Sequence, residues 1–285
     1  MSKNYRAELT ACFGDPVDGN PTGVMEEAAF AAKGLNWRYL TVLVKDGDLA
    51  QALDGAKAMQ FRGLNLTMPH KRTVIPYLDG LTEAAEIIGA VNTVLVQNGR
   101  WIGENTDGKG FVSALERSGV TLEGKSVTVL GAGGAARAIA VECALAGAKK
   151  LTIVNRSEKH GRELAQLLAE KTKAESAYLP WTPSMAVPAE TEILIQATCM
   201  GLFPNVQDKP DLDYDTITAD MVACDVVFNP VDPLFLQEAR KRGAKTISGI
   251  GMLVQQGALN FTYWTGEEAP LEVMYETLER EFQGE

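Results

Sequence analysis

A lysine and an aspartate in the first half of the chain have the residue types that proton transfer requires. Lys71 ends the segment Asn65-Leu-Thr-Met-Pro-His-Lys71 after an expected strand, and Asp107 lies in the turn Asn105-Thr-Asp-Gly108. Asn92, at the start of another expected strand, is a third polar candidate. A lysine beside a carboxylate suits the oxidation of an alcohol, because a proton must leave the hydroxyl as hydride leaves the carbon. Taken singly, these residues also fit a solvated lysine and turn-forming Asn or Asp, so the hypothesis depends on their convergence at one cleft.

A glycine-rich turn in the middle of the chain indicates a dinucleotide site. Residues 131–136 read Gly-Ala-Gly-Gly-Ala-Ala and match the pattern G-x-G-x-x-G/A. The turn lies between an expected strand at 126–130 and an expected helix at 138–146, with Gly147 where a C-cap glycine belongs. The first glycine makes the tight turn, the second lets the backbone approach a pyrophosphate, and the helix N-terminus favours the anion. The alternative is a tight turn that binds no ligand.

The end of the next expected strand, at 151–154, favours NADP over NAD. This strand runs into Asn155-Arg156-Ser157, without the acid that would hold a ribose 2′-hydroxyl. Arg156 is placed to stack on adenine and to bind a 2′-phosphate, with Ser157 and Lys159 or Arg162 assisting. Glu158 comes one step too late and is flanked by cations. NAD stays possible, and a solvated surface arginine is the alternative reading of Arg156.

The elements that position these residues alternate between strand and helix along the chain. This alternation predicts a Rossmann-like, doubly wound α/β domain at residues 108–247, with the dinucleotide at its glycine-rich turn. The first hundred residues repeat the alternation more weakly, and the C-terminal segments 253–264 and 271–282 are expected to be helices that return to the first domain. We therefore expect two α/β domains, a substrate-binding domain of residues 1–107 plus 248–285 and the dinucleotide domain, with the site in the cleft between them.

The composition excludes several classes of partner. The net charge of −10 argues against nucleic acid and an anionic membrane as partners, because both need a positive surface. The four cysteines lie far apart, and only two histidines occur, which disfavours a metal site or a disulfide framework. The first residues lack the apolar region of a signal peptide. We expect a cytoplasmic protein, a monomer or a homodimer, with a small-molecule substrate and no bound metal.

Several segments together resemble the shikimate dehydrogenase family over nearly the whole chain. Besides those above, the matching segments are Phe13-Gly-Asp-Pro16, Ala90-Val-Asn-Thr93, Ala197-Thr-Cys-Met-Gly201, Asp225–Pro230 and Gly249-Ile-Gly-Met-Leu-Val-Gln-Gln256. The resemblance implies that Lys71 transfers the proton at the reacting oxygen while Asp107 bonds to the same hydroxyl. It implies contacts to the substrate from Thr67, Asn92 and Gln256. It also implies a cofactor site formed by Gly131, Ala132, Gly133, Gly134, Ala135, Asn155, Arg156, Ser157, Thr198, Val226 and Gly249.

The chain departs from the family pattern in three places. Asn20-Pro-Thr22-Gly replaces the usual Ser-x-Ser-Pro that grips the substrate carboxylate, although Asn20 and Thr22 still offer hydrogen-bond donors. Phe228 replaces a tyrosine and removes a hydroxyl donor from the same end of the substrate. His160 stands where many members carry a second cofactor-loop arginine. A buried polar site discriminates strongly between substrates, because a poorly matched substrate leaves polar groups without hydrogen-bond partners. The first two departures therefore affect which acid the site can bind.

The resemblance implies an NADP-dependent shikimate dehydrogenase that interconverts a ring hydroxyl and ketone in the pathway to aromatic amino acids. Two alternatives stay open from the sequence. One is a paralogue that acts on quinate, an aminoshikimate or a related ring carboxylic acid, as the departures at Asn20, Thr22 and Phe228 suggest. The other is a non-catalytic nucleotide-sensing module, against which the presence of both Lys71 and Asp107 counts.

Overall fold

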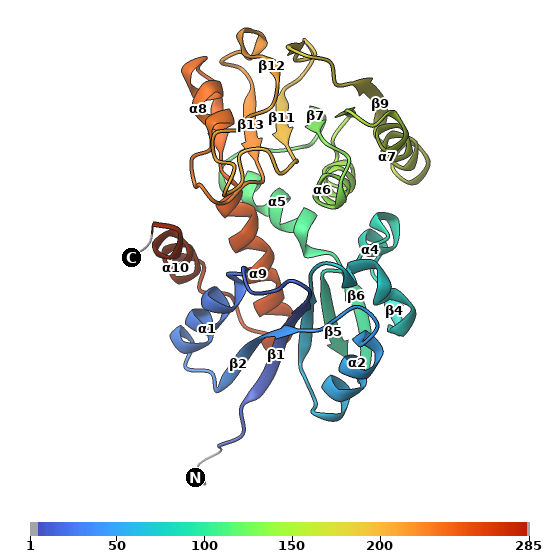
Figure 1. Cartoon of the computed structure of the whole chain (residues 1–285), viewed down its shortest axis with the longest axis vertical. Helices are drawn as coiled ribbons and strands as arrows, with labels where there is room; N and C mark the ends of the chain where they lie inside the picture. Colours follow the sequence, from blue (N-terminus) through green and yellow to red (C-terminus); the bar gives the residue numbers. More distant parts are fainter. Residues whose placement is uncertain (1–4, 284–285) are drawn as a thin grey trace. The chain divides into compact units, whose positions relative to one another are not determined.

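The computed structural model describes residues 5–283 and divides into two compact units (Figure 1). The first contains the described residues up to Thr106 together with Gln256–Glu281, and the second contains Asp107–Gln255 with the described residues from Phe282 on. The expected domain ends at residues 1 and 285 lie outside the described residues. Residues 248–255, expected in the first domain, group with the second unit. The reason is close packing, because Gly249 lies directly against the backbone of residues 226–227.

The second unit is built on a six-stranded sheet in which every pairing is parallel. Its strands are β7 (Ser126–Leu130), β8 (Lys150–Asn155), β9 (Glu175–Pro180), β11 (Ile193–Gln196), β13 (Val222–Asp225) and β14 (Lys245–Ile247). Their order, β14-β13-β11-β7-β8-β9, changes direction between β7 and β11. This is the doubly wound arrangement, whose ligands bind beyond the carboxyl ends of the strands at the change of direction. The predicted fold class is confirmed.

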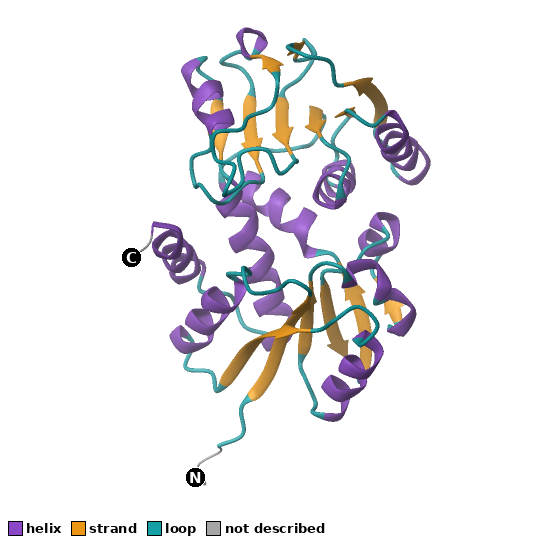
Figure 2. Cartoon of the chain, viewed as in Figure 1, coloured by secondary structure: helices purple, strands orange, loops and turns teal. Residues whose placement is uncertain are grey.

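The helices of the second unit follow from the sequence in simple ways. They are α5 (Thr106–Arg117), α6 (Gly134–Leu145), α7 (Glu158–Lys171) and α8 (Leu234–Lys241), and Figure 2 shows them beside the strand layer. Most residues of α6 are small or aliphatic, and the helix is buried along most of its length. In contrast, α7 buries only one stripe, formed by Gly161, Leu164, Ala165 and Leu168. Such a stripe is typical of a surface helix on a sheet.

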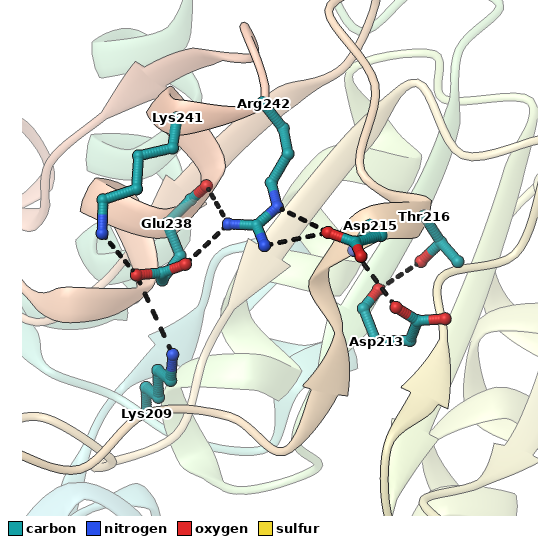
Figure 3. A network of polar contacts seen from close by, with 7 residues as sticks. All are labelled: Lys209, Asp213, Asp215, Thr216, Glu238, Lys241 and Arg242. Atoms are coloured by element: carbon teal, nitrogen blue, oxygen red, sulfur yellow. Dashed lines mark hydrogen bonds and ion pairs between the residues drawn. The ribbon is translucent and has the colours of Figure 1, made fainter.

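A network of charged side chains ties the outer face of α8 to the segment before β13 (Figure 3). Arg242 follows α8 and donates to Glu238 at 2.6 Å and to Asp215 at 3.0 Å. Glu238 also accepts from Lys241 at 2.7 Å and lies 4.0 Å from Lys209. These cations lower the pKa of the Glu238 carboxyl from its ordinary value of 4.5 to about 2. The network secures α8 and has no role in the site described below.

The first unit is built on a mixed six-stranded sheet. Its strands are β1 (Glu8–Gly14), β2 (Trp37–Leu43), β3 (Gly63–Leu66), β4 (Gly80–Leu81), β5 (Thr93–Gln97) and β6 (Arg100–Glu104), in the order β2-β1-β3-β5-β6-β4. β1 pairs in parallel with β2 and β3, whereas β5 is antiparallel to β3 and β6. Asn98 and Gly99 both have positive φ angles, 52° and 75°, as a two-residue hairpin requires. These two residues therefore form the turn that joins β5 to β6.

Helices complete the first unit and bring the end of the chain back to it. They are α1 (Thr22–Ala32), α2 (Leu49–Ala58), α3 (His70–Thr73), α4 (Glu83–Ile88), the later part of α9 (Gly249–Thr265) and most of α10 (Leu271–Gln283). Phe261 of α9 stacks on Phe30 of α1, with ring centroids 5.5 Å apart. Trp264 donates from its indole nitrogen to the carbonyl oxygen of Val94 at 3.2 Å. As expected, the C-terminal helices cover the first unit rather than add strands of their own.

Candidate functional site

The glycine-rich turn of the second unit lies where the strand order changes direction. Gly131 directly follows β7 with a φ of +114°, and a Cβ there would lie 3.0 Å from the carbonyl oxygen of Ala197 and from Cγ2 of Thr198. Gly133 caps α6 with an extended backbone and no side-chain hydrogen bond. A Cβ added at Gly133 or Gly134 would meet no atom within 4 Å. The N-terminus of α6 is therefore open for an anion, and its shape fits a dinucleotide pyrophosphate.

The segment after β8 presents one arginine without a described protein partner. Asn155 donates to the carbonyl oxygen of Ser157 at 2.9 Å, and Ser157 caps α7 by accepting from the backbone N–H of His160. Arg156 is exposed, and within residues 5–283 no ion pair or hydrogen bond of its side chain is described. Arg162 instead pairs with Glu158 at 2.7 Å. The Glu158 carboxylate therefore has its own cation, which leaves Arg156 as the arginine available to a 2′-phosphate.

The carboxyl ends of β11 and β13 carry two polar residues that sequence analysis did not single out. Gln196 accepts from the backbone N–H of Thr198 at 2.6 Å and donates to the carboxylate of Asp225 at 3.2 Å. Asp225 also accepts from the backbone N–H of Val227 at 2.9 Å. Burial raises the pKa of the Asp225 carboxyl to about 7. These bonds hold the loops of Thr198 and Val226, two of the expected cofactor residues, at the carboxyl edge of the sheet.

Lys71 is held in the first unit by a one-turn helix that sequence analysis did not predict. The helix α3 begins directly after Pro69, which occupies the N-cap position. His70 is fully buried and its Nε2 lies 2.6 Å from the carbonyl oxygen of Val44. The carbonyl oxygen of Lys71 accepts from the backbone N–H of Val91 at 2.7 Å. The backbone of Lys71 is therefore fixed on both sides, and its side chain is half-buried.

A buried network connects two of the expected substrate residues. Asn92 accepts from the backbone N–H of Thr106 at 2.7 Å and donates to the Thr106 hydroxyl at 3.0 Å. Asn260 accepts from the same hydroxyl at 3.0 Å and donates to Oε1 of Gln256 at 3.2 Å. Thr93 donates to Asn260 at 2.9 Å. Thr93 and Thr106 lie in quoted segments but were given no role, and Asn260 was not identified, because its only signal is a polar residue inside an apolar pattern.

Asp107 and Thr67 belong to different units. Asp107 is the second residue of α5 and groups with the second unit, although we expected it in the first domain. Because Lys71 groups with the first unit, the approach of the two side chains stays a prediction. Thr67 is half-buried, and its backbone N–H donates to the carbonyl oxygen of Phe13 at 3.0 Å.

The loop that departs from the family pattern uses its polar groups internally. Asn20 donates to the sulfur of Cys12 at 3.3 Å and accepts from the backbone N–H of Thr22 at 3.0 Å. Thr22 opens α1 and is only 5% exposed. In the second unit, the ring of Phe228 packs on Phe282 with centroids 5.3 Å apart. Within this loop a carboxylate therefore finds fewer uncommitted donors than a pair of serines would offer.

The described residues offer neither a metal-binding cluster nor a helix that could cross a membrane. Within residues 5–283, no three His, Cys, Asp or Glu side chains gather in a way that could hold a metal ion. Over the same range, no helix combines the length and the apolar character that crossing a membrane requires.

Together, the doubly wound sheet, the open N-terminus of α6 and the arginine after β8 define a dinucleotide-binding α/β protein of the dehydrogenase type. Comparison with known families identifies it further. Residues 12–94 match the shikimate dehydrogenase substrate binding domain, residues 113–202 match shikimate / quinate 5-dehydrogenase, and residues 249–279 match the shikimate 5'-dehydrogenase C-terminal domain. The chain belongs to the shikimate dehydrogenase family, and it is an oxidoreductase.

Individual relatives span nearly the full length of the chain. The NADP(+) shikimate dehydrogenase of Desulforamulus reducens is 40% identical over 98% of this chain and 97% of its own. The ligand-free crystal structure of 5-ketofructose reductase from Gluconobacter sp. strain CHM43 is similar with a TM-score of 0.94, at 44% identity over 98% of this chain and all of that one. The Thermus thermophilus shikimate 5-dehydrogenase in complex with NADP(H) and shikimate has a TM-score of 0.83 and 34% identity, over 96% of this chain and 99% of its own.

Proposed function

We propose that this chain is an NADP-dependent shikimate dehydrogenase, which transfers hydride reversibly between the nicotinamide and the ring hydroxyl or ketone of shikimate and 3-dehydroshikimate. The observation that carries the proposal is the open N-terminus of α6 behind Gly131, with the exposed arginine Arg156 after the neighbouring strand. The NADP(+) shikimate dehydrogenases that span nearly the whole chain support it. When bound, the nicotinamide supplies and accepts the hydride.

The residues of the chain bind and orient the cofactor. The N–H groups at the start of α6 hold the pyrophosphate, and the helix dipole adds to that attraction. Arg156 binds the 2′-phosphate through two parallel hydrogen bonds, which selects NADP over NAD. The loops of Thr198, Val226 and Gly249 line the nicotinamide half, supported by the bonds of Gln196 to Asp225.

The proton is moved by Lys71 in this proposal. As the alcohol is oxidised, Lys71 receives the hydroxyl proton, and in the reverse direction it returns the proton to the oxygen. Asp107 accepts a hydrogen bond from the same hydroxyl and holds it toward the lysine. Thr67, Asn92 and Gln256 bind the other ring hydroxyls, and the bond between Asn260 and Gln256 fixes which end of the glutamine amide meets the substrate.

A second candidate is the reduction of a polyhydroxy ketone that carries no carboxylate. The specific observation is that the side-chain amide of Asn20 is hydrogen-bonded to Cys12 and to the backbone N–H of Thr22. The loop therefore has few hydrogen-bond donors left for an anionic substrate. The structural similarity to a 5-ketofructose reductase points the same way, because 5-ketofructose has no carboxylate. Quinate and other ring acids remain within the proposal as substrates of the same chemistry. We further propose that the enzyme works in the cytoplasm, as a monomer or a homodimer.

A steady-state assay of the purified chain tests the function. Shikimate and quinate are offered with NADP and with NAD, and 5-ketofructose is offered with NADPH, while the reduced nicotinamide is followed by absorbance. Turnover of shikimate with NADP supports the leading proposal. Turnover of 5-ketofructose alone would establish the second candidate, and cofactor binding without turnover of any of the three would contradict both.

A further inference from the structure

A carboxyl group without any partner is buried in α1 of the first unit. The side chain of Glu26 is fully buried, and neither of its oxygen atoms has a hydrogen-bond partner among the described residues. It lies on the buried face of α1 with Met25, Ala29 and Phe30. An apolar residue would fill such a position more favourably, since a buried polar group is costly unless it is hydrogen-bonded. In native structures, unsatisfied groups of this kind point to a function or to a ligand.

The position of Glu26 relates it to two of the expected substrate residues. Thr22 precedes it by four residues on α1, so both side chains lie on the same face of the helix. A Cβ on Gly257 would lie 3.3 Å from Oε1 of Glu26, and Gly257 directly follows Gln256 on α9. The carboxyl group therefore lies between the helix face that carries Thr22 and the turn of α9 that carries Gln256. The absence of a side chain at Gly257 provides the room.

The charged and titratable groups around Glu26 do not neutralise it. Burial raises the pKa of Glu26 well above its usual range, and no cation counteracts this effect. Burial raises the pKa of the Tyr39 hydroxyl on β2, and the nearby Cys12 and Glu26 raise it further. On β1, burial raises the pKa of the Cys12 thiol to about 11, although nearby Lys71 acts in the opposite direction. On α1 itself, Glu27 accepts the backbone N–H of Tyr39 and is committed to β2.

We propose that Glu26 is a specificity-determining residue whose carboxyl group lies against the bound substrate between Thr22 and Gln256, and that it selects neutral polyhydroxylated substrates over ring carboxylates. The proposal rests on the dehydrogenase chemistry of the proposed function and, of its two candidate substrates, favours the neutral polyhydroxy ketone. A neutral hydroxyl can donate to this carboxyl group or accept from it. A substrate carboxylate at the same place binds only when Glu26 is protonated, because two like charges in a buried site repel each other.

The consequence is that binding of an anionic substrate is linked to a proton. Below the folded-state pKa of Glu26, a ring carboxylate binds without penalty. Above that pKa, the carboxylate binds only if Glu26 takes up a proton, so the KM of the anion rises by about tenfold for each pH unit. A substrate with the same ring and no charge is not linked in this way, and its KM stays constant. This pH dependence arises from repulsion between the Glu26 carboxylate and the substrate carboxylate. A residue that only supports packing would not produce it.

Shikimate and its methyl ester form the matched pair of probes, since they share the ring hydroxyls and differ in charge. We expect the ratio of kcat/KM for shikimate to kcat/KM for the ester to fall as the pH rises in the wild type. In the isosteric variant Glu26→Gln we expect the ratio to be independent of pH and higher than in the wild type at alkaline pH. The Glu27→Gln variant is the control, because it makes the same change one residue along and its amide oxygen can still accept from Tyr39. It should follow the wild type.

The outcomes separate this inference from the proposed function. Equal ratios in the wild type and in Glu26→Gln at every pH, with both proteins active, would overturn the inference and leave the dehydrogenase function intact. If neither probe is turned over, the proposed function fails. The binding constants of shikimate and its methyl ester are then measured by calorimetry in the presence of NADP, and their ratio replaces the kinetic one. Binding of neither probe, or equal binding ratios in the two proteins, would overturn the inference as well. Thermal unfolding of all three proteins shows that each is folded.

Discussion

The side-chain oxygen of Asn92 accepts the backbone N–H of Thr106 at 2.7 Å, one residue before Asp107. The bond satisfies a backbone N–H at the first residue of α5, a position where helices leave donors without partners. The amide of Asn92 thus has two tasks, since it is also an expected contact to the substrate. The position of the backbone before Asp107 therefore depends on Asn92, which directly precedes β5, as well as on α5 itself.

Replacement of Asn92 by alanine should therefore impair both folding and activity. We expect the Asn92→Ala variant to lose about 1–3 kcal/mol in free energy of unfolding, because the buried partners at Thr106 are left unsatisfied. Its kcat/KM for shikimate should fall as well. Denaturant titration and steady-state kinetics measure the two effects. The Asn36→Ala variant, which removes an exposed bond to Arg6, should change neither, and equal losses in both variants would argue against the assignment.

Arg156 and Arg162 should differ sharply in their effect on the cofactor. We expect Arg156→Ala to weaken NADP binding by about 10- to 100-fold, because a charge-assisted hydrogen bond contributes about 1.5–3 kcal/mol. NAD has no 2′-phosphate, so its binding should be nearly unchanged. The Arg162→Ala variant removes a cation that already pairs with Glu158, so its effect on NADP should be small. Dissociation constants from fluorescence titration provide the comparison. A similar loss of NADP affinity in both variants would contradict the role given to Arg156.

Gly131 is constrained by its backbone and by its neighbours at once. Its φ of +114° is unfavourable for any residue with a side chain, and a Cβ there would lie 3.0 Å from the carbonyl oxygen of Ala197. We expect Gly131→Ala to lower stability by about 1–3 kcal/mol and to weaken NADP binding, because the turn that opens α6 must shift. Gly124, with a φ of +72° and open space around it, is the matched control. Gly124→Ala should lower stability and leave the cofactor affinity unchanged.

Much of this fold follows from patterns within single segments. The bounds of β7 agree with the expected strand at 126–130, since a short run of β-branched residues that ends at a glycine leaves few alternatives. The helix α10 likewise begins at residue 271, where the expected C-terminal helix begins. The doubly wound order follows from the alternation of these elements once the glycine-rich turn is found.

The parts that could not be predicted depend on contacts between distant segments. The helix α3 is only one turn long, and the bond of His70 to Val44 helps to fix it, which no local pattern reveals. Asn260 is an ordinary polar residue in the sequence and becomes important only because α9 brings it beside Thr93 and Thr106. Glu26 reads as a solvated helix residue, and only the packing of α9 at Gly257 shows that it is buried.

Titration of Asp225 should contribute to the pH dependence of the stability of the protein. Burial raises its pKa from 3.8 to about 7, so between these values the folded state holds a proton that the unfolded state has lost. The contribution of Asp225 to stability therefore falls as the pH rises from about 4 to about 7. We expect Asp225→Asn to match the wild type near pH 4 and to be the more stable protein near pH 8, as measured by thermal unfolding. A stability difference that is constant over this range would contradict the assignment.

If Lys71 moves the proton during hydride transfer at an NADP site, its removal slows the chemical step without weakening cofactor binding. Single-turnover and steady-state rates are compared for the wild type and Lys71→Ala with shikimate and NADP, alongside the dissociation constant for NADPH. The account predicts that kcat falls by about 10²- to 10⁴-fold while the NADPH dissociation constant is unchanged. Turnover near the wild-type rate in the variant would contradict the account and place the proton transfer on another group.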